Sequence, residues 1–375
     1  MLQALCGARV FTGEHVLDDH AVLLDGGRVA DVLPMSQLPA ELHREKLDGG
    51  LLAPGFLDVQ INGAGGVLFN DTPTAEGAAA IAAAVRPTGA TGLLPTFITD
   101  RPEPRARATA AIRAAAGMPG ILGLHLEGPF LSRARKGAHD PALIVPMTDA
   151  DVDALLATGL DTLLVTVAAE NATPAQIRRL TDGGVIVSLG HSDASYAVAC
   201  AAADAGARGV THLFNAMSQL GHRGPGVVGA ALDHGGLWGG IIADGHHVDP
   251  AALRIALRAK RGPGRLFLIS DAMPPVGVPG DSFVLSGRAV TRRDGRLLLD
   301  DGTLAGADLT MDGAVRFAVV NLDVSLTEAL RMASLYPATF LRLEGERGRI
   351  ARGFRADLVH LDEALAVRRS WIDGH

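Results

Sequence analysis

Eight short apolar runs, separated by Ala-rich stretches of helical character, constrain this 375-residue chain more than any other feature of its sequence. Runs rich in Val, Ile and Leu that alternate with helices are typical of a parallel sheet whose strands are joined by helices. The runs are GFLDVQIN (55–62), GLLPTFIT (92–99), GILGLHLE (120–127), DTLLVTVA (161–168), GVIVSLGH (184–191), GVTHLFN (209–215), GGIIADGHH (239–247) and RLFLISDA (265–272). Eight such units predict a TIM-type (β/α)8 barrel, and a doubly wound open sheet is the weaker alternative.

Helical stretches lie between most of these runs. The expected helices cover 74–86, 103–116, 148–158, 173–182, 193–206 and 249–260, and two more follow the last run at 311–320 and 325–341. Thr148, Thr173 and Asp249 stand where an N-cap residue would begin a helix. The connections after the first and the sixth run show a less clear helical pattern.

The two ends of the chain differ in character from the middle. Residues 1–53 are expected to form short strands separated by glycine turns, notably a hairpin at the Asp-Gly-Gly sequence 25–27. Residues 343–375 return to turns and strands of the same kind. We therefore expect the two ends to pair into one small β-sandwich domain beside a barrel of residues 54–342.

A separate insertion follows the eighth apolar run. Residues 281–303 alternate apolar and charged positions around Asp294-Gly295, a dipeptide that favours a tight turn. The segment is predicted to form a hairpin near the mouth of the barrel.

The charge and cysteine content exclude several classes of protein. A net charge of -7 argues against a nucleic-acid surface or a polybasic membrane patch, so an anionic substrate would need a local basic pocket. The two cysteines, Cys6 and Cys200, are far apart and resemble neither a disulfide framework nor a thiolate metal site. Because the sequence shows neither a secretion signal nor a long apolar stretch, we expect a cytoplasmic protein.

Polar side chains of the metal-ligand and acid-base types end six of the eight runs. Catalytic residues of a TIM-type barrel lie at the C-terminal ends of its strands, so these positions are the candidate site. They are Gln60 and Asn62, Glu127, His191, His212, His247 and Asp271. A single histidine at the end of a buried strand is more often structural, but a whole ring of such residues indicates function.

One glutamate and two histidines form the ligand set of a catalytic metal site. Glu127, His191 and His212 would supply three ligands and leave one position open for water, which suits hydrolysis of an amide or ester. Asp271 is expected to take the proton of that water and pass it to the leaving amine. His139, in the sequence KGAHDP, is expected to donate to the developing oxyanion, the alternative being that it only holds its loop.

At this point the sequence resembles the amidohydrolase superfamily, and within it the N-acetylglucosamine-6-phosphate deacetylases. The resemblance covers nearly the whole chain and is carried by PGFLDVQINGAGG (54–66), LHLEGPF (124–130), KGAHDP (136–141), SLGHSDAS (188–195), THLFNAM (211–217), IIADGHHVD (241–249), ISDAMPPVG (269–277) and TLAGADLTM (303–311). The wider superfamily has His-x-His at the end of the first strand, where this chain has Gln60 and Asn62. The resemblance therefore implies one divalent ion per subunit, expected to be zinc, with iron, cobalt and manganese as alternatives.

The resemblance also implies the substrate and the residues that contact it. The expected reaction is hydrolysis of the acetamide of N-acetyl-D-glucosamine 6-phosphate to D-glucosamine 6-phosphate and acetate, a step of amino sugar catabolism. The implied substrate contacts are Ala138, His139, Asn215, Ala216, Arg223, His247, Leu304, Ala305 and Gly306. Ala138 stands where relatives often have a hydroxylated residue, and Gly224 and His246 lie in variable loops, so fine substrate preference is left open.

Three alternatives remain at the level of sequence. The substrate could be the epimer N-acetylgalactosamine 6-phosphate, or the chain could be a sugar-phosphate binding protein without activity, which the intact ligand set argues against. Arg223, in LGHRGPG, is predicted to bind the phosphate, either in its own subunit or across the interface of the homodimer that the resemblance suggests. If Arg223 only makes a surface ion pair, Lys136 is the next candidate for the phosphate.

Overall fold

The eight apolar runs form one parallel sheet in a computed structural model that describes residues 2–375. Its strands are β8 (Phe56–Ile61), β11 (Ala90–Ile98), β12 (Leu124–Glu127), β13 (Leu163–Val167), β14 (Ile186–Leu189), β15 (Gly209–Val210), β16 (Trp238–Ile242) and β17 (Leu266–Ile269). They lie side by side in chain order. The sheet closes on itself because Ile61 pairs with Ala272 and the amide of Asp271 donates to the carbonyl oxygen of Gln60 at 2.9 Å. The predicted TIM-type barrel is confirmed.

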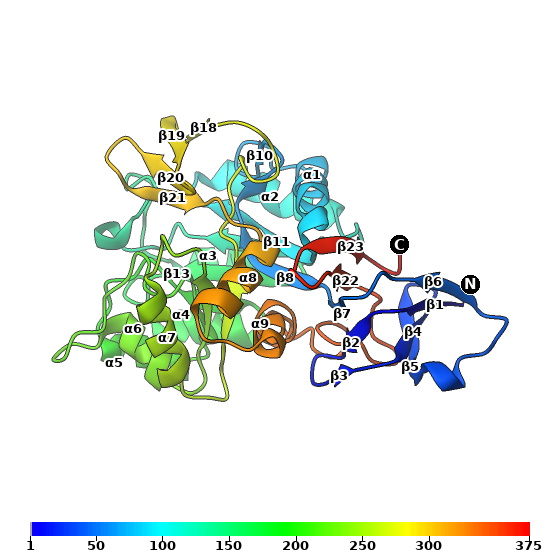
Figure 1. Cartoon of the computed structure of the whole chain (residues 1–375). Coiled ribbons are helices and arrows are strands. Elements are labelled where there is room, and N and C mark those ends of the chain that lie inside the picture. The colour runs from blue at the N-terminus through cyan, green and yellow to red at the C-terminus, as the bar shows by residue number, and fades with distance from the viewer. Residues whose placement is uncertain (1) are drawn as a thin grey trace.

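Helices follow the strands around the barrel (Figure 1). They are α1 (Ala75–Val85), α2 (Pro102–Ala114), α3 (Asp149–Leu156), α4 (Pro174–Asp182), α5 (Tyr196–Asp204), α6 (Gly226–Asp233), α7 (Pro250–Ala259), α8 (Met311–Asn321), α9 (Leu326–Ala333) and α10 (Leu335–Phe340). Thr148, Thr173 and Asp249 are N-cap residues, as predicted, and the side chain of each accepts a backbone N–H. Helix α6 lies in the connection that showed no clear pattern in the sequence.

The helix expected over 325–341 is two helices in the structure. The chain leaves the helical conformation at Ser334, where φ is -132° and ψ is -72°. Pro337 explains the break, because its ring would clash with the carbonyl group of Ala333 in a continuous helix and it has no N–H to donate. The hydroxyl of Ser334 donates to the carbonyl oxygen of Leu330 at the break.

The N- and C-terminal segments form two sheets beside the barrel, the blue and red ribbons of Figure 1. One sheet has the order β5 (Arg28–Pro34), β4 (His20–Asp25), β1 (Gln3–Cys6) and β6 (His43–Lys46), and the other has the order β23 (Val367–Trp371), β22 (Leu358–Leu361), β7 (Leu51–Pro54), β2 (Arg9–Phe11) and β3 (Val16–Leu17). Leu5 and Val22 of the first sheet share one apolar core with Leu358 and Trp371 of the second. The predicted pairing of the two chain ends is confirmed by β7 and β22, which are antiparallel neighbours.

The second sheet also joins the small domain to the barrel. Its other face contributes Phe11, Leu51 and Val359 to the large apolar core of the barrel. The hairpin expected at 25–27 is present between β4 and β5, where Asp25 pairs with Arg28. Gly26 and Gly27 both have positive φ there, which is the conformation that a two-residue hairpin turn requires.

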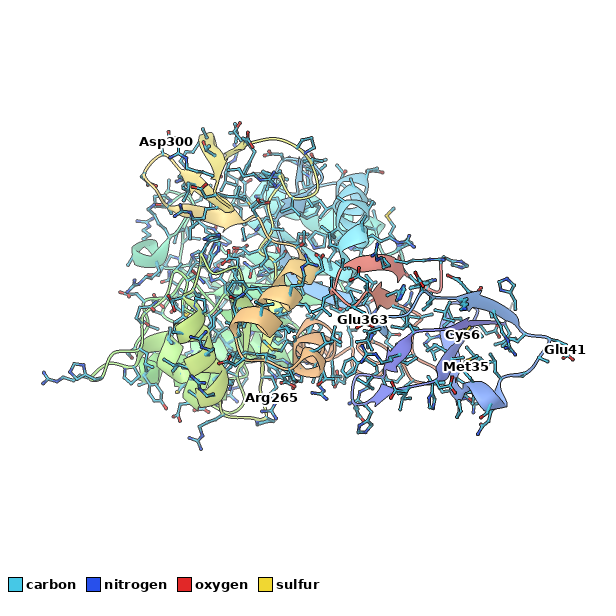
Figure 2. The ribbon with its side chains drawn as sticks, viewed as in Figure 1. Cys6, Met35, Glu41, Arg265, Asp300 and Glu363 are labelled. Carbon is cyan, nitrogen blue, oxygen red and sulfur yellow. The ribbon has the colours of Figure 1, made fainter. Side chains whose placement is uncertain are left out.

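The insertion after β17 is larger than a hairpin. It forms an antiparallel sheet of β18 (Ser282–Leu285), β19 (Arg288–Arg293), β20 (Arg296–Leu299) and β21 (Leu304–Ala307), and a short hairpin of β9 (Gly63–Ala64) and β10 (Val67–Leu68) lies after β8. Asp294-Gly295 is one of its turns. Its apolar residues pack on Leu68, Ile98 and Met273 of the barrel. In Figure 2, Asp300 marks this sheet at the top of the molecule, and Glu41 marks the end of the small domain at the right.

Two further expectations concern the chain as a whole. Cys6 and Cys200 are both free thiols. Within the described part of the chain, residues 2–375, no helix is both long and apolar enough for a membrane span.

Candidate active site

A cavity of about 350 Å³ opens at the C-terminal ends of the barrel strands. This volume lies in the range of small-molecule sites. The cavity is lined by the following sequence-predicted residues: Asn62, Glu127, Ala138, His139, His191, His212, Asn215, Ala216, His247, Asp271, Leu304, Ala305 and Gly306. The structure therefore brings together every proposed metal, proton-transfer and substrate residue except Arg223.

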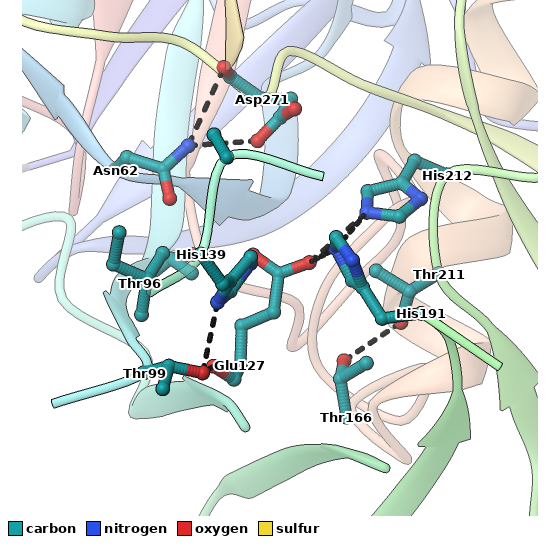
Figure 3. A network of polar contacts seen from close by, with 12 residues as sticks. Asn62, Thr96, Thr99, Glu127, His139, Thr166, His191, Thr211, His212 and Asp271 are labelled. Carbon is teal, nitrogen blue, oxygen red and sulfur yellow. Dashed lines mark hydrogen bonds and ion pairs between the residues drawn. The ribbon is translucent and has the colours of Figure 1, made fainter. Parts of the chain in front are cut away.

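Glu127, His191 and His212 converge on one point inside this cavity (Figure 3). Oε1 of Glu127 lies 3.0 Å from Nε2 of His212 and 3.3 Å from Nε2 of His191. The two histidine Nε2 atoms are themselves 3.1 Å apart. All three side chains are buried, so the atoms that could bind a metal ion face one another in a small space.

Three residues that follow barrel strands share one backbone conformation. His191, His212 and Asp271 follow β14, β15 and β17 by two residues, and all three have positive φ, at 46°, 33° and 51°. Left-handed backbone is uncommon for residues other than glycine and is concentrated at functional sites. Because the same turn recurs at three strands, the side chains point into one cavity.

Hydrogen bonds and burial set the protonation of the cluster. Nδ1 of His191 lies 2.8 Å from the carbonyl oxygen of Arg135 and can only donate there, so a neutral ring presents the lone pair of Nε2 to Glu127. Burial alone would raise the pKa of Glu127, but the adjacent His191 and His212 rings hold it well below its usual range. For His212, burial would lower the pKa, and the bond to Glu127 raises it. One carboxylate and imidazole nitrogens with these partners form a cluster that could hold a divalent ion.

His139 lies at the edge of the same cluster. Its Nε2 is 3.9 Å from Oε2 of Glu127, and Nδ1 is 2.8 Å from the hydroxyl of Thr99. The possible ligand atoms of Glu127, His139 and His191 lie within 4.8 Å of one another, so His139 is close enough to act beside the metal position. Burial, reinforced by His191, lowers the pKa of His139 to about 3, and the ring is neutral at neutral pH.

Asp271 lies opposite the histidines and is held by two amides. Its Oδ1 accepts hydrogen bonds from Nδ2 of Asn62 at 2.7 Å and Nε2 of Gln60 at 3.2 Å. Oδ2 has no hydrogen-bond partner among residues 2–375, which leaves it available on the cavity side. Burial, and then repulsion by Glu127, raise the pKa of Asp271 to about 6.

His247 is fixed by a carboxylate that comes three residues before it. Oδ2 of Asp244 is 2.6 Å from Nδ1 of His247, and Oδ1 accepts the backbone N–H groups of His246 and His247. Burial opposes the ionised form of Asp244, but these hydrogen bonds lower its pKa below the usual value. His247 therefore has a defined orientation at the wall of the cavity.

The segment from Leu304 to Gly306 forms another wall. Gly306 has a φ of 68°, and a Cβ atom there would lie 2.4 Å from Cγ of Met273. Only glycine fits this close approach without displacing Met273. Asn215 and Ala216 line the cavity after β15, and Ala138 lines it from the loop after β12.

Arg223 is the one predicted residue that the fold does not bring to this cavity. It is exposed in the loop before α6 and does not line the cavity of its own chain. Its expected action across a subunit interface stays a prediction. Nearer cations are Arg135, which lines the cavity and pairs with Asp193 at 2.8 Å, and Arg288, whose guanidinium donates to the carbonyl oxygen of Ala138.

Several residues of the site were not assigned a role from the sequence. In the sequence, Gln60 and Asn62 are interpreted only as replacements for the His-x-His pair of metal ligands. Their position at a strand end could have marked them as residues of the site. Thr99 ends the second apolar run, and Asp244 precedes His247 in the seventh, so the same signal could have found both. Nothing in the sequence marks the carbonyl group of Arg135.

Comparisons with known proteins agree with this architecture. A family model described as the amidohydrolase family matches residues 51–374, and one described as the NagA composite domain matches residues 2–52. The chain is 41% identical over 376 residues to the N-acetylgalactosamine-6-phosphate deacetylase of Shewanella sp. (strain ANA-3), covering 98% of this chain and 94% of the relative. It is 40% identical over 397 residues to the N-acetylglucosamine-6-phosphate deacetylase of Homo sapiens, covering 99% of this chain and 96% of the relative.

A solved structure extends the similarity to three dimensions. It is that of a variant of the N-acetyl-D-glucosamine-6-phosphate deacetylase from Mycobacterium smegmatis, in complex with N-acetyl-D-glucosamine-6-phosphate. The TM-score is 0.92 at 33% identity, and the match covers 100% of this chain and 98% of that chain. Because both the family model and these relatives span nearly the whole sequence, the chain belongs to the amidohydrolase family, with a NagA composite domain at its N-terminal end.

Proposed function

We propose that this protein hydrolyses the acetamide group of an acetamido sugar 6-phosphate, with N-acetyl-D-glucosamine 6-phosphate as the substrate and acetate and D-glucosamine 6-phosphate as products. The observation that carries the proposal is the convergence of Glu127, His191 and His212 within 3.3 Å, opposite Asp271, in one cavity. In this proposal the barrel of residues 54–342 carries the chemistry. Residues 1–53 and 343–375 form the supporting β domain.

The metal site in this proposal holds one divalent ion per chain. The ligands are Glu127, His191 and His212, and zinc is the proposed metal. This donor set also accepts iron, cobalt or manganese according to supply. The ion would polarise the amide carbonyl group and lower the pKa of a water molecule. Gln60 and Asn62 present amide groups to Asp271 and not ligands to a second ion.

Asp271 moves the proton. Its Oδ2 accepts the proton of the attacking water and delivers it to the nitrogen of the leaving amine, while Oδ1 stays bonded to Asn62 and Gln60. The raised pKa, about 6, suits a group that must first take and then return a proton near neutrality. A neutral His139 donates from Nε2 to the carbonyl oxygen as charge develops on it. For this role the Thr99 hydroxyl directs its single hydrogen to Nδ1 of His139 and not to the carbonyl oxygen of Glu127, 3.3 Å away.

The remaining residues of the cavity orient the sugar phosphate. Ala138, Asn215, Ala216, His247 and the segment 304–306 surround the substrate, and Arg223 of a partner subunit reaches the phosphate in a homodimer. The dianion needs such a cation because the chain as a whole has a net charge of -7.

N-acetylgalactosamine 6-phosphate is the second candidate substrate. The relative from Shewanella that carries this activity in its name is 41% identical, and the human relative named for the glucosamine epimer is 40% identical. A difference of this size does not favour either epimer, so both need to be assayed.

The test is a substrate panel with metal-loaded protein. Acetate release would be measured with both 6-phosphosugars and with unphosphorylated N-acetylglucosamine. We expect kcat/KM to be highest for N-acetylglucosamine 6-phosphate and lowest for the sugar without phosphate. Preference for the galactosamine epimer would replace the proposed substrate, and absence of acetate release from all three would remove the proposed reaction.

A further inference from the structure

Gln60 lies between two carboxylates in the floor of the cavity. It is the penultimate residue of β8, and its side chain is buried. Nε2 is 3.2 Å from Oε1 of Glu127 and 3.2 Å from Oδ1 of Asp271. An oxygen atom at this position would face two anionic oxygens at short range, so the geometry requires the NH2 group of the carboxamide here.

The NH2 group of Gln60 has one N–H bond for each of the two carboxylates. A carboxamide NH2 group has two N–H bonds, and each can donate to one of the two carboxylates. Asn62, the neighbouring amide, donates only to Asp271, and of the two carboxylates His191 and His212 contact only Glu127. Among residues 2–375, Gln60 is the one side chain that bonds to both carboxylates.

The backbone around Gln60 leaves its side chain little freedom. Its carbonyl oxygen accepts the N–H of Asp271 at 2.9 Å, and its own N–H donates to Oδ1 of Asp58 at 3.3 Å. The same residue thus closes the barrel through its main chain and joins the two carboxylates through its side chain. Glu127 and Asp271 come from strands β12 and β17, which are not neighbours in the sheet.

We propose that Gln60 is a positioning residue that couples the carboxylate of Glu127 to that of Asp271, orienting the first for the metal ion and the second for proton transfer. The inference rests on the proposed roles of these two residues. The partial positive charge of the amide NH2 group lies between the two carboxylates and reduces their mutual repulsion. Because Gln60 and Asn62 both donate to Oδ1 of Asp271, they leave Oδ2 as the oxygen that meets the substrate.

The test replaces Gln60 by methionine, which has a similar length and shape but no donor. In full-length metal-free Gln60→Met, zinc affinity would be measured by competition with a chromophoric chelator, and kcat and KM would be measured after metal loading. Loss of a hydrogen bond that orients a metal ligand commonly lowers metal affinity by about 10- to 100-fold. Loss of a donor to the proton-transfer carboxylate should lower kcat about tenfold or more while KM changes little.

Two control variants separate coupling from general damage. Asn62→Leu removes a donor from Asp271 alone, so kcat should fall while zinc affinity stays at the wild-type value. Gln176→Met removes a buried carboxamide of α4 that donates to the carbonyl oxygen of Met147, and this residue does not line the cavity. It should lower the melting temperature and leave both zinc affinity and kcat unchanged.

The distinctive result is a loss of both zinc affinity and kcat in Gln60→Met with a loss of kcat alone in Asn62→Leu. Wild-type zinc affinity in Gln60→Met, wild-type kcat in the loaded variant, or an equal loss of zinc affinity in Asn62→Leu would each overturn the coupling. If Gln60→Met does not fold, Gln60→Asn serves instead, since its amide is one methylene too short to reach both carboxylates. The zinc titration uses no substrate, so it decides on Gln60 even if the wild-type protein hydrolyses neither sugar phosphate.

Discussion

Asp244 and His247 form a buried pair in which the carboxylate oxygen lies 2.6 Å from Nδ1 of the ring. The carboxylate can only accept, so it fixes the hydrogen on Nδ1. Asp244→Asn keeps the acceptor for the backbone N–H groups but presents an NH2 group to the ring, which forces the hydrogen onto Nε2. We expect kcat/KM to fall about 10- to 100-fold with unchanged metal content, by analogy with other histidine-orienting groups. Nitrogen NMR shifts of His247 would report the tautomer, and a wild-type tautomer with wild-type kinetics would contradict the assignment.

Metal removal should abolish turnover. Dialysis against a chelator is expected to give inactive protein with a lower melting temperature, because the ion binds only the folded arrangement of Glu127, His191 and His212. Activity should return on addition of about one equivalent of zinc per chain, counted by elemental analysis during the titration. Recovery that requires two equivalents would mean that a second ion binds despite Gln60 and Asn62.

Replacing Asp271 should separate binding from chemistry. Asp271→Asn retains the size of the side chain but cannot accept the proton of water, so kcat should fall by about two to four orders of magnitude. Metal content and substrate affinity should remain close to the wild-type values, as measured by elemental analysis and isothermal titration. Near wild-type turnover in this variant would move the proton-transfer role to His139.

Arg223 tests both the phosphate contact and the interface. Arg223→Gln should lower kcat/KM for the phosphorylated sugar about 10- to 150-fold relative to the free sugar, the range expected for a charged hydrogen bond. Arg178→Gln, a substitution at an exposed helical position, is the matched control and should change neither value. Equal losses on both sugars would indicate that Arg223 supports the fold or the interface, and Lys136 would become the candidate.

Asp58 should make stability depend on pH. Burial raises the pKa of Asp58 to about 7 in the folded protein, although Ser270 donates a hydrogen bond to it. In the unfolded chain the pKa of an aspartate carboxyl group is about 3.9. Between about pH 4 and pH 7 the folded state therefore binds more protons than the unfolded state, and the free energy of unfolding falls as pH rises. The fall contributed by Asp58 is on the order of 4 kcal/mol and levels off above pH 7.

Asp58→Asn removes this contribution. Urea unfolding of the metal-free wild-type and variant proteins at pH 5 and pH 8 would give the difference between their free energies of unfolding at each pH. The variant should gain stability relative to the wild type on going from pH 5 to pH 8. A constant difference between the two proteins would show that Asp58 is not protonated in the folded state at pH 5.

Much of the fold and site follows from simple regularities of sequence. Parallel barrel strands bring their C-terminal ends together, so Glu127, His191, His212 and Asp271 could be placed in one site from strand ends alone. Similarly, N-cap residues such as Thr148 act through local contacts and were recognisable without tertiary structure.

Other features depend on contacts that no local pattern contains. The role of Gln60 arises from residues 67 and 211 positions away, and the two-helix form of 325–341 depends on how Ser334 and Pro337 pack. Arg223 shows that closeness in sequence to a strand end is not sufficient, because this loop arginine does not line the cavity.

The pairing of β7 with β22 bears on how the protein is made. His360 of β22 pairs with Leu52 of β7, and its Nε2 donates to the carbonyl oxygen of Gly49, 311 residues earlier, at 2.8 Å. During synthesis, the N-terminal strands therefore emerge from the ribosome long before their partners exist. The barrel is complete in sequence before β22 and β23 appear, so it can fold first and hold β7 in place as a template. The last strands then complete the small domain after the barrel segment has been made.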